Sequence, residues 1–254
     1  MSNEILISGN SGFIGKNLTI FLKKKKLSVV DFEKRKNKKY KQLVYLKFFI
    51  SKNKTKNFNK NLKYSKKILN FSKKTKTDIL FISTHLPLAI KKNYNQLNDY
   101  QKAKYRIEEL LLKEKNFKIK ILRLPNVYGP GSKYGVVSDL LNKFLNKKKI
   151  YVKNSNNYRE FLYINDVCRI IYKSIYLNKS FSLFAGSGYK VKIEKLATII
   201  GREFKNKIII FDKKKDQKNK LSFSNKKFNK IFKNFKFSNL KKNINIMIKQ
   251  KYPV

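Results

Sequence analysis

One tyrosine–lysine pair stands where three reactive groups can meet. Tyr100 and Lys104 lie four residues apart in NDYQKAK, a spacing that puts both side chains on one helix face. A neighbouring cation favours the phenolate, so we expect Tyr100 to act as an acid/base nearer neutral pH than a free tyrosine. With 15 tyrosines and 56 lysines (62 basic residues less six arginines), roughly three such pairs are expected by chance, and one occurs. The position of the pair, after a strand ending in Ser83 and Thr84, makes it a specific sign of a reactive site. A hydroxyl, a phenol and an ammonium can then converge on one carbonyl or carbinol.

A glycine-rich stretch near the N-terminus predicts a phosphate-binding turn. The segment ILISGNSGFIGKNL, residues 5–18, runs from three apolar residues through Gly9, Gly12 and Gly15 into a helical pattern. Glycines between a first strand and a first helix allow a tight turn and bring backbone N–H groups against a pyrophosphate. They also let the helix pack closely on the strand. The spacing is G-x-x-G-x-x-G, so this prediction depends on the rest of the chain.

An aspartate near the end of the second expected strand bears on the choice of nucleotide. Asp31 can accept hydrogen bonds from a ribose 2′-hydroxyl, which favours NAD. Arg35 and the lysines beside it can instead meet a 2′-phosphate, which would favour NADP. An ordinary strand-end aspartate is the third interpretation, so the residue does not fix the cofactor.

Apolar runs and helical patterns alternate along the chain. We expect strands at residues 5–7, 27–32, 43–50, 77–83, 119–124, 150–152, 181–185 and 207–211. We expect helices at residues 16–26, around 62–71, at 100–113, at 136–144, up to 175 and at 193–200, with mostly lysine-rich helix in the remainder. This alternation predicts an α/β fold with a doubly wound parallel sheet and a smaller C-terminal α/β lobe. We place the first domain at residues 1–129 and the lobe at 130–254, with about 159–180 returning to the first domain.

The composition excludes several classes of protein. A single cysteine, Cys168, excludes a disulfide framework and a cysteine metal cluster, and a single histidine, His85, excludes a multi-histidine zinc site. No apolar run approaches the roughly 20 residues that cross a bilayer. The chain enters its first strand directly, without a signal peptide, so we expect a cytoplasmic protein.

The formal charge of +47 has two interpretations. It can mark a binder of nucleic acid or of anionic membranes. It can instead reflect A+T-rich codons, which favour Lys, Asn, Ile, Phe and Tyr. The lysines are spread along the whole chain and only six of the 62 basic residues are arginine, so we favour the compositional explanation. The charge would still attract an anionic substrate.

The ordered motifs resemble those of the extended short-chain dehydrogenases/reductases, the family of NAD(P)-dependent nucleotide-sugar epimerases, dehydratases and reductases. Besides GNSGFIG, Ser83–Thr84 and the Tyr100–Lys104 pair, the chain carries LRLPNVYGPG at 122–131, REFLYINDV at 159–167 and FAGSGYKVKIEKLA at 184–197. The resemblance covers nearly the whole chain. It implies a Rossmann-like NAD(P) domain followed by a substrate lobe.

The resemblance also implies roles for particular residues. Thr84 would hydrogen-bond the substrate oxygen at the reacting carbon, and Tyr100 would exchange a proton with it. Lys104 would hold the nicotinamide ribose and lower the tyrosine pKa. Asn126 would lie near the nucleotide-sugar phosphates and Arg159 would clamp the pyrophosphate, although a turn residue and a surface arginine are the alternatives there. The implied cofactor-binding residues are Gly9, Gly12, Phe13, Ile14, Gly15, Asp31, Tyr100 and Lys104.

The chain departs from the family pattern at two places. Dehydratases of the family carry an Asp-Glu pair directly after the catalytic threonine, whereas this chain has His85 and Leu86, so we do not expect dehydration. About one β–α unit is missing before residues 77–83, and residues 43–51 are a degenerate remnant of the small-residue run beside the nicotinamide. This loss bears on cofactor affinity and on activity.

The resulting expectation is an enzyme that passes hydride between a sugar carbon and NAD, with NADP as the alternative. A nucleotide-sugar 4-epimerase comes first, and a 4-keto-reductase would use the same residues. Its substrate would be a nucleoside-diphosphate sugar for surface polysaccharide, and we expect a homodimer with no metal, membrane or nucleic-acid partner. The alternative of another class is a catalytically inactive member that binds nucleotide or nucleic acid.

Overall fold

The computed structural model describes residues 3–50, 54–85, 97–205, 207–212 and 224–251 of the 254-residue chain. The chain divides into two compact units, Met1–Leu124 with Cys168–Ala185, and Pro125–Val167 with Gly186–Val254. Each unit contains its own hydrophobic core. No helix among the described residues is long and apolar enough to cross a membrane.

A parallel sheet forms the centre of the first unit. Its strands are β1 (Glu4–Ser8), β2 (Ser28–Asp31), β3 (Gln42–Tyr45), β4 (Ile79–Thr84), β5 (Ile119–Leu124) and β9 (Phe181–Phe184). Its helices are α1 (Phe13–Lys24), the 3-10 helix η1 (Phe32–Lys34), α2 (Lys54–Thr75), α4 (Asp99–Leu112) and most of α6 (Ile164–Ile175). The strand order is β2-β1-β3-β4-β5-β9, and every neighbouring pair is parallel. The α/β fold predicted from the sequence is confirmed.

This sheet is one strand shorter on one side than the doubly wound pattern. In the order 3-2-1-4-5-6, a third strand lies outside the second. Among the described strands, β2 ends the sheet and β3 pairs directly with β1. Residues 32–41, which join β2 to β3, are too few for a helix and a further strand. The prediction that a β–α unit is missing is therefore confirmed.

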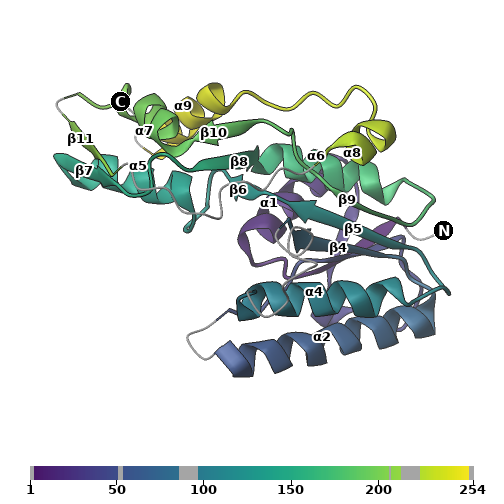
Figure 1. Cartoon of the computed structure of the whole chain (residues 1–254). Coiled ribbons are helices and arrows are strands. Elements are labelled where there is room, and N and C mark those ends of the chain that lie inside the picture. Colours follow the sequence, from purple (N-terminus) through teal and green to yellow (C-terminus); the bar gives the residue numbers. More distant parts are fainter. Residues whose placement is uncertain (1–2, 51–53, 86–96, 206, 213–223, 252–254) are drawn as a thin grey trace. The chain divides into compact units, whose positions relative to one another are not determined.

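Helices cover both faces of the sheet. Figure 1 shows α2 and α4 side by side on one face, and α2 turns Tyr64, Ile68 and Phe71 toward the strands. These residues follow the i, i+4, i+7 spacing of one helix face, which explains why α2 packs on the sheet although it is rich in lysine. Elsewhere in the unit, α1 packs against α6, with the rings of Phe21 and Tyr172 6.0 Å apart.

The second unit contains two small sheets and four helices of its own among the described residues. The strands are β6 (Asn126–Tyr128), β7 (Lys149–Val152), β8 (Tyr158–Tyr163), β10 (Lys190–Lys192) and β11 (Ile208–Phe211). The helices are α5 (Val136–Asn146), α7 (Ile193–Gly201), α8 (Lys226–Ile231) and α9 (Leu240–Lys251). The sheet orders are β10-β8-β6 and β11-β7. Phe144 and Leu196 lie at the centre of the apolar core that joins these elements.

The element boundaries differ from the predicted ones where single backbone contacts decide them. Strand β3 ends at Tyr45 rather than at residue 50. The N–H groups of Leu46 and Lys47 both donate to Ser8 O, at 3.0 and 2.9 Å, and draw the chain out of the sheet. Helix α1 begins at Phe13, directly after Gly12, instead of at residue 16. Strands β6, β8 and β10 were not predicted. Strands β6 and β10 have three residues each, which are too few to show a periodicity, and residues 158–163 of β8 were expected only to lead into a helix.

Candidate active site

The glycine stretch forms the turn between β1 and α1. Gly9 adopts a φ of +88°, which favours glycine, and its carbonyl accepts from the N–H of Gly12 at 3.2 Å. A Cβ at Gly9 would lie 2.8 Å from the backbone nitrogen of Lys47, and a Cβ at Gly15 would lie 2.1 Å from Gly9 O. Two of the three glycines are therefore required by close backbone packing alone.

Gly12 has a different role, because it opens the end of α1. It is the N-cap residue, and no side chain of the described residues caps the helix there or places a carboxylate in its first turn. A Cβ at Gly12 would meet only Gly9 O, at 3.4 Å. The N–H groups of Phe13 and Ile14 in the first helical turn have no partner within the helix, and the positive end of the helix dipole favours an anion. This end of α1 therefore fits a pyrophosphate.

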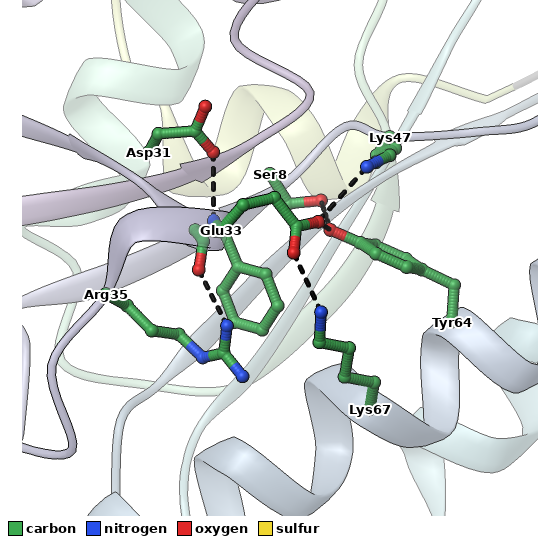
Figure 2. Close-up of polar contacts among 8 residues, drawn as sticks. Ser8, Asp31, Glu33, Arg35, Lys47, Tyr64 and Lys67 are labelled. Carbon is green, nitrogen blue, oxygen red and sulfur yellow. Dashed lines mark hydrogen bonds and ion pairs between the residues drawn. The ribbon is translucent and has the colours of Figure 1, made fainter.

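Asp31 ends β2, and Arg35 follows the 3-10 helix η1; the side chains of both bond the backbone of η1. Asp31 Oδ1 accepts from the N–H of Glu33 at 3.0 Å and caps η1 (Figure 2). Arg35 donates from Nη1 to Phe32 O at 2.8 Å, and its guanidinium carbon lies 3.9 Å from the centre of the Phe32 ring. Asp31 can still offer a carboxylate oxygen to a ribose, whereas the planar face of the Arg35 guanidinium is already stacked on the Phe32 ring.

Glu33 is the centre of a network that was not predicted from the sequence. Its carboxylate accepts from Lys67 Nζ at 2.7 Å, Tyr64 OH at 2.8 Å and Lys47 Nζ at 3.1 Å, and Tyr64 OH lies 3.1 Å from Ser8 Oγ (Figure 2). The hydrogen bond from Lys67, with those from Tyr64 and Lys47, lowers the pKa of Glu33 to about 2, although burial opposes it. The network ties the end of β1 to η1 and α2, next to the glycine turn.

Thr84 lies at the carboxyl end of the sheet. It is the last residue of β4, it is buried, and it pairs in register with Leu124 of β5. His85 follows it, with Nδ1 3.1 Å from Leu124 O and the backbone N–H donating to the same oxygen at 3.2 Å. In a parallel sheet all carboxyl ends share one edge, so Thr84 lies on the same edge as the glycine turn. Leu86, the other departure from the dehydratase pattern, lies outside the described residues.

Helix α4 carries Tyr100 in its first turn. Asn98 and Gln101 form a capping box that fixes where the helix begins, with bonds of 3.0 and 2.9 Å. Tyr100 is 37% exposed, and burial of its hydroxyl raises its pKa to about 12. No charged group contributes to this shift. The prediction that Lys104 lowers the tyrosine pKa is therefore wrong for the free protein.

The reason is the direction of the Lys104 side chain. Its Nζ donates to Ile82 O at 2.8 Å and lies 4.6 Å from the centre of the Phe81 ring. Burial lowers its pKa to about 7, while Glu108 raises it. Glu108 is buried and accepts from Arg123 Nε at 2.9 Å. The ammonium is thus turned toward β4, and a buried carboxylate one helical turn further favours its charged form.

Phe48 completes the surroundings of the pair. Its ring centre is 4.9 Å from that of Tyr100, with the planes at 72°, and Lys104 Nζ lies 4.5 Å from the ring centre. The side chain comes from the segment after β3, where the sequence lacks the small residues of the family pattern. Phe48 was not predicted as a site residue, and the residue pair FF at 48–49 was the available signal. The phosphate end of the site thus fits a dinucleotide as it stands, while Phe48 contacts both catalytic candidates.

The two predicted substrate residues lie in the second unit. Asn126 Nδ2 donates to Glu160 O at 3.0 Å, which makes it a link between β6 and β8. Arg159 lines a cavity of about 240 Å³ together with Lys143 and Lys153, and its Nη1 donates to Tyr158 O at 2.9 Å. Asp139 lines the same cavity and pairs with Lys143 at 3.0 Å, so Arg159 and Lys153 are the cationic side chains that suit an anionic ligand there.

A larger cavity belongs to the first unit. It has a volume of about 710 Å³ and runs along α2, where Arg35, Lys63 and Lys67 line it with the rings of Phe49 and Phe71. Tyr100, Lys104 and Thr84 are not among its lining residues. Its size alone therefore does not place the reaction there.

Comparison with known proteins gives a family and a fold. Residues 49–180 match the model of the NAD dependent epimerase/dehydratase family. No curated protein sequence matches the chain.

Among solved structures, TunA, an NAD-dependent NDP-hexosamine 5,6-dehydratase of tunicamycin biosynthesis, has a TM-score of 0.85 and 16% identity, over 98% of each chain. A GDP-L-fucose synthetase from Naegleria fowleri bound to NADP has a TM-score of 0.80 and 18% identity, over 98% of this chain and 93% of its own. UDP-glucose 4-epimerase from Thermotoga maritima, with UDP-glucose, has a TM-score of 0.79 and 16% identity, over 97% of each chain. At these identities the likeness establishes the fold.

Proposed function

Because this chain belongs to the NAD-dependent epimerase/dehydratase family, we propose that it is an NAD(P)-dependent nucleotide-sugar epimerase. The observation that carries the proposal is the combination, within one unit, of an open glycine turn with Thr84, Tyr100 and Lys104. A binding protein needs the turn but has no need of the three reactive groups. Sugar chemistry at one carbon needs all of them.

The dinucleotide would be held by the glycine turn and Asp31 at its adenosine half and by Lys104 at its nicotinamide ribose. The N–H groups of Phe13 and Ile14 suit the pyrophosphate. When bound, the nicotinamide would supply a hydride acceptor and donor. We propose NAD, because Asp31 can accept from a 2′-hydroxyl and Arg35 is engaged by Phe32; NADP is the alternative.

Tyr100 would move the proton at the reacting carbon, and Thr84 would hydrogen-bond the same substrate oxygen. In the free protein the phenol, with a pKa of about 12, is protonated at neutral pH and ready to donate. Taking a proton from a hydroxyl requires a lower pKa than the free protein gives Tyr100, so the direction that starts with proton donation is the one its present surroundings support.

The second unit would bind the nucleoside diphosphate. Arg159 offers a planar fork of donors to phosphate oxygens, and Lys143 and Lys153 lie around the same cavity. Asn126 would act less directly, because its amide is engaged by Glu160 O. The similarity to a structure with UDP-glucose and to a GDP-L-fucose synthetase supports a sugar nucleotide as the substrate class. As part of the same proposal, the enzyme works as a homodimer in the cytoplasm and supplies sugars for surface polysaccharide.

Two other reactions use the same residues. A 4-keto-reductase would consume NAD(P)H, and an NADP-bound GDP-L-fucose synthetase is among the similar structures. Dehydration is favoured by the likeness to TunA but opposed by His85 in place of an acidic residue. The covering of Tyr100 and Lys104 by Phe48 favours the remaining candidate, an inactive nucleotide-binding member of the fold.

The decisive experiment uses Tyr100→Phe, with Tyr105→Phe on the same helix as the matched control. We expect UDP- or dTDP-sugar turnover to fall by about a hundredfold to ten-thousandfold in Tyr100→Phe and to persist in the control. Absorbance at 340 nm separates the reactions, since an epimerase leaves the total NADH unchanged and a reductase consumes it. Turnover that survives Tyr100→Phe contradicts the role of the tyrosine. A protein that holds no nicotinamide and turns over no sugar supports the inactive alternative.

A further inference from the structure

Phe48 contacts both residues that the proposed function needs at the reacting carbon. Its ring stands edge-on to Tyr100, with the centres 4.9 Å apart, and lies 4.5 Å from Lys104 Nζ. We propose that Phe48 is a side-chain gate, which covers Tyr100 and Lys104 in the free protein and turns aside when a nicotinamide ring enters. This inference rests on the proposed function and adds a regulation of the same site.

The first support is that the Lys104 ammonium is fully engaged. An ammonium group has three N–H donors. One donates to Ile82 O at 2.8 Å, and the faces of Phe81 and Phe48 lie 4.6 and 4.5 Å from the nitrogen. Neither Ile82 O, a backbone atom of β4, nor the buried ring of Phe81 can withdraw easily. A ribose hydroxyl that approaches Lys104 must therefore displace Phe48.

The second support is that the backbone on both sides of Phe48 is fixed. The N–H of Lys47 donates to Ser8 O at 2.9 Å. The N–H and the carbonyl of Phe49 both bond the side-chain amide of Asn61, at 2.9 and 3.0 Å, and Asn61 is 1% exposed. Because these contacts hold the main chain, movement of Phe48 is confined to rotation of its side chain.

The third support is that the ring is only partly held. Phe48 is half-buried and packs at the margin of the apolar core of the unit, and its contacts with Tyr100 and Lys104 are an aromatic edge and a cation–π contact. Contacts of this kind are each small, and a partly exposed side chain changes rotamer quickly. The closed arrangement is thus stable enough to dominate in the free protein and weak enough to open. A ligand that must open this arrangement binds about tenfold more weakly than it would bind the open protein.

The test compares two ligands that differ by the nicotinamide and its ribose. We would measure the binding of NADH and of ADP, which lacks both groups, to the wild-type protein, to Phe48→Ala and Phe48→Leu, and to Phe49→Ala as the matched control. Isothermal titration calorimetry gives each dissociation constant. We expect Phe48→Ala to bind NADH about tenfold more tightly and ADP unchanged, with Phe48→Leu between it and the wild type. Phe49→Ala should not separate the two ligands.

A second readout follows the ring directly. The chain contains no tryptophan, so Phe48→Trp introduces a single tryptophan at the gate. We expect NAD⁺ to shift the tryptophan emission to the red and to raise its quenching by acrylamide, and ADP to leave both unchanged. An emission that does not respond to NAD⁺ while NAD⁺ binds overturns the gate.

A failure of the gate and a failure of the proposed function give different results. If ADP and NADH bind but Phe48→Ala leaves the dissociation constant of NADH unchanged or weakens the binding, the gate is wrong and the proposed function is untouched. If neither ligand binds any variant whose thermal unfolding is normal, the proposed function fails and the gate fails with it.

Discussion

The two ends of the proposed dinucleotide site are built in different ways. The phosphate end consists of backbone, with the N–H groups that open α1, and a Cβ at Gly12 would meet only Gly9 O. The reactive end consists of side chains, and Phe48 and Ile82 O engage Lys104 there. Backbone groups at a helix start are in place as soon as the helix forms. The chemistry of a side chain depends on the neighbours that packing places around it. The reactive end therefore decides whether a protein of this fold is active, gated or inactive.

The largest effect is expected when the buried ion pair between Glu108 and Arg123, next to the reactive end, is broken. In Glu108→Gln, the Arg123 guanidinium would lose a buried carboxylate, and Lys104 would lose the charge that favours its ammonium form. We expect a loss of about 3–5 kcal/mol in the free energy of unfolding, measured by urea denaturation. Glu109→Gln is the control, since the pair with Arg106 is exposed and worth less than about 1 kcal/mol. Equal losses of stability in the two variants would show that the buried ion pair stabilises the fold no more than the exposed one.

The phosphate end is tested with two glycines. Gly15→Ala places a Cβ 2.1 Å from Gly9 O, so α1 must shift, and we expect a loss of about 2–3 kcal/mol in urea denaturation. Gly12→Ala has room and an ordinary φ of −75°, so its stability should change by less than about 1 kcal/mol. Its affinity for ADP-ribose should fall, because the methyl group occupies the approach to the helix start. A large loss of stability in Gly12→Ala would break the distinction between packing and binding glycines.

The charge of Lys104 gives the reactive end a pH dependence. Its pKa is lowered from 10.5 to about 7 by burial, so the unfolded chain binds more protons than the folded one between these values. The free energy of unfolding should therefore rise with pH across this window. Lys104→Met removes this contribution, and we expect the rise between pH 7 and 9 to be smaller by about 1–2 kcal/mol than in the wild type. Identical pH profiles for wild type and variant would contradict the burial of the ammonium.

The smallest expected effect concerns the Glu33 network beside the glycine turn. The pKa of Glu33 is lowered from 4.5 to about 2, so its contribution is present above pH 4.5 and lost as the pH falls toward 2. Both Glu33 and Lys67 are more than a third exposed, so we expect Lys67→Met to cost about 0.5 kcal/mol at pH 7 and less in high salt. The variant should also lose less stability on acidification. Lys66→Met, at the preceding position of α2, is the control, and its stability at both pH values should match that of the wild type.

Sequence patterns predicted the frame of the first unit because local composition determines it. Residues 79–84 form β4 close to the expected 77–83, since a short apolar run fits a buried parallel strand. The shortened sheet was also predictable, because so few residues separate β2 from β3. The Tyr100–Lys104 pair was placed correctly on α4.

The direction of side chains was not predictable in the same way. Spacing alone puts Lys104 beside Tyr100, but the carbonyl of Ile82 and the ring of Phe81, both on β4, draw its ammonium away. Phe48 enters the site because the chain turns at Lys47 to meet Ser8 O, which is a contact between residues far apart in sequence. Such contacts depend on the packed structure and leave no periodic signal in the chain.

The shortened sheet has one further consequence, for association between molecules. It makes β2 the end strand, and an end strand offers backbone hydrogen bonds to any extended chain that meets it. Here the strand is only four residues long, and exposed lysines stand on both sides of it, at Lys25 and Lys26 before it and at Lys34 and Lys36 after it. Short length and like charge both oppose the addition of a strand from a second copy. The loss of a β–α unit therefore leaves an edge that resists aggregation.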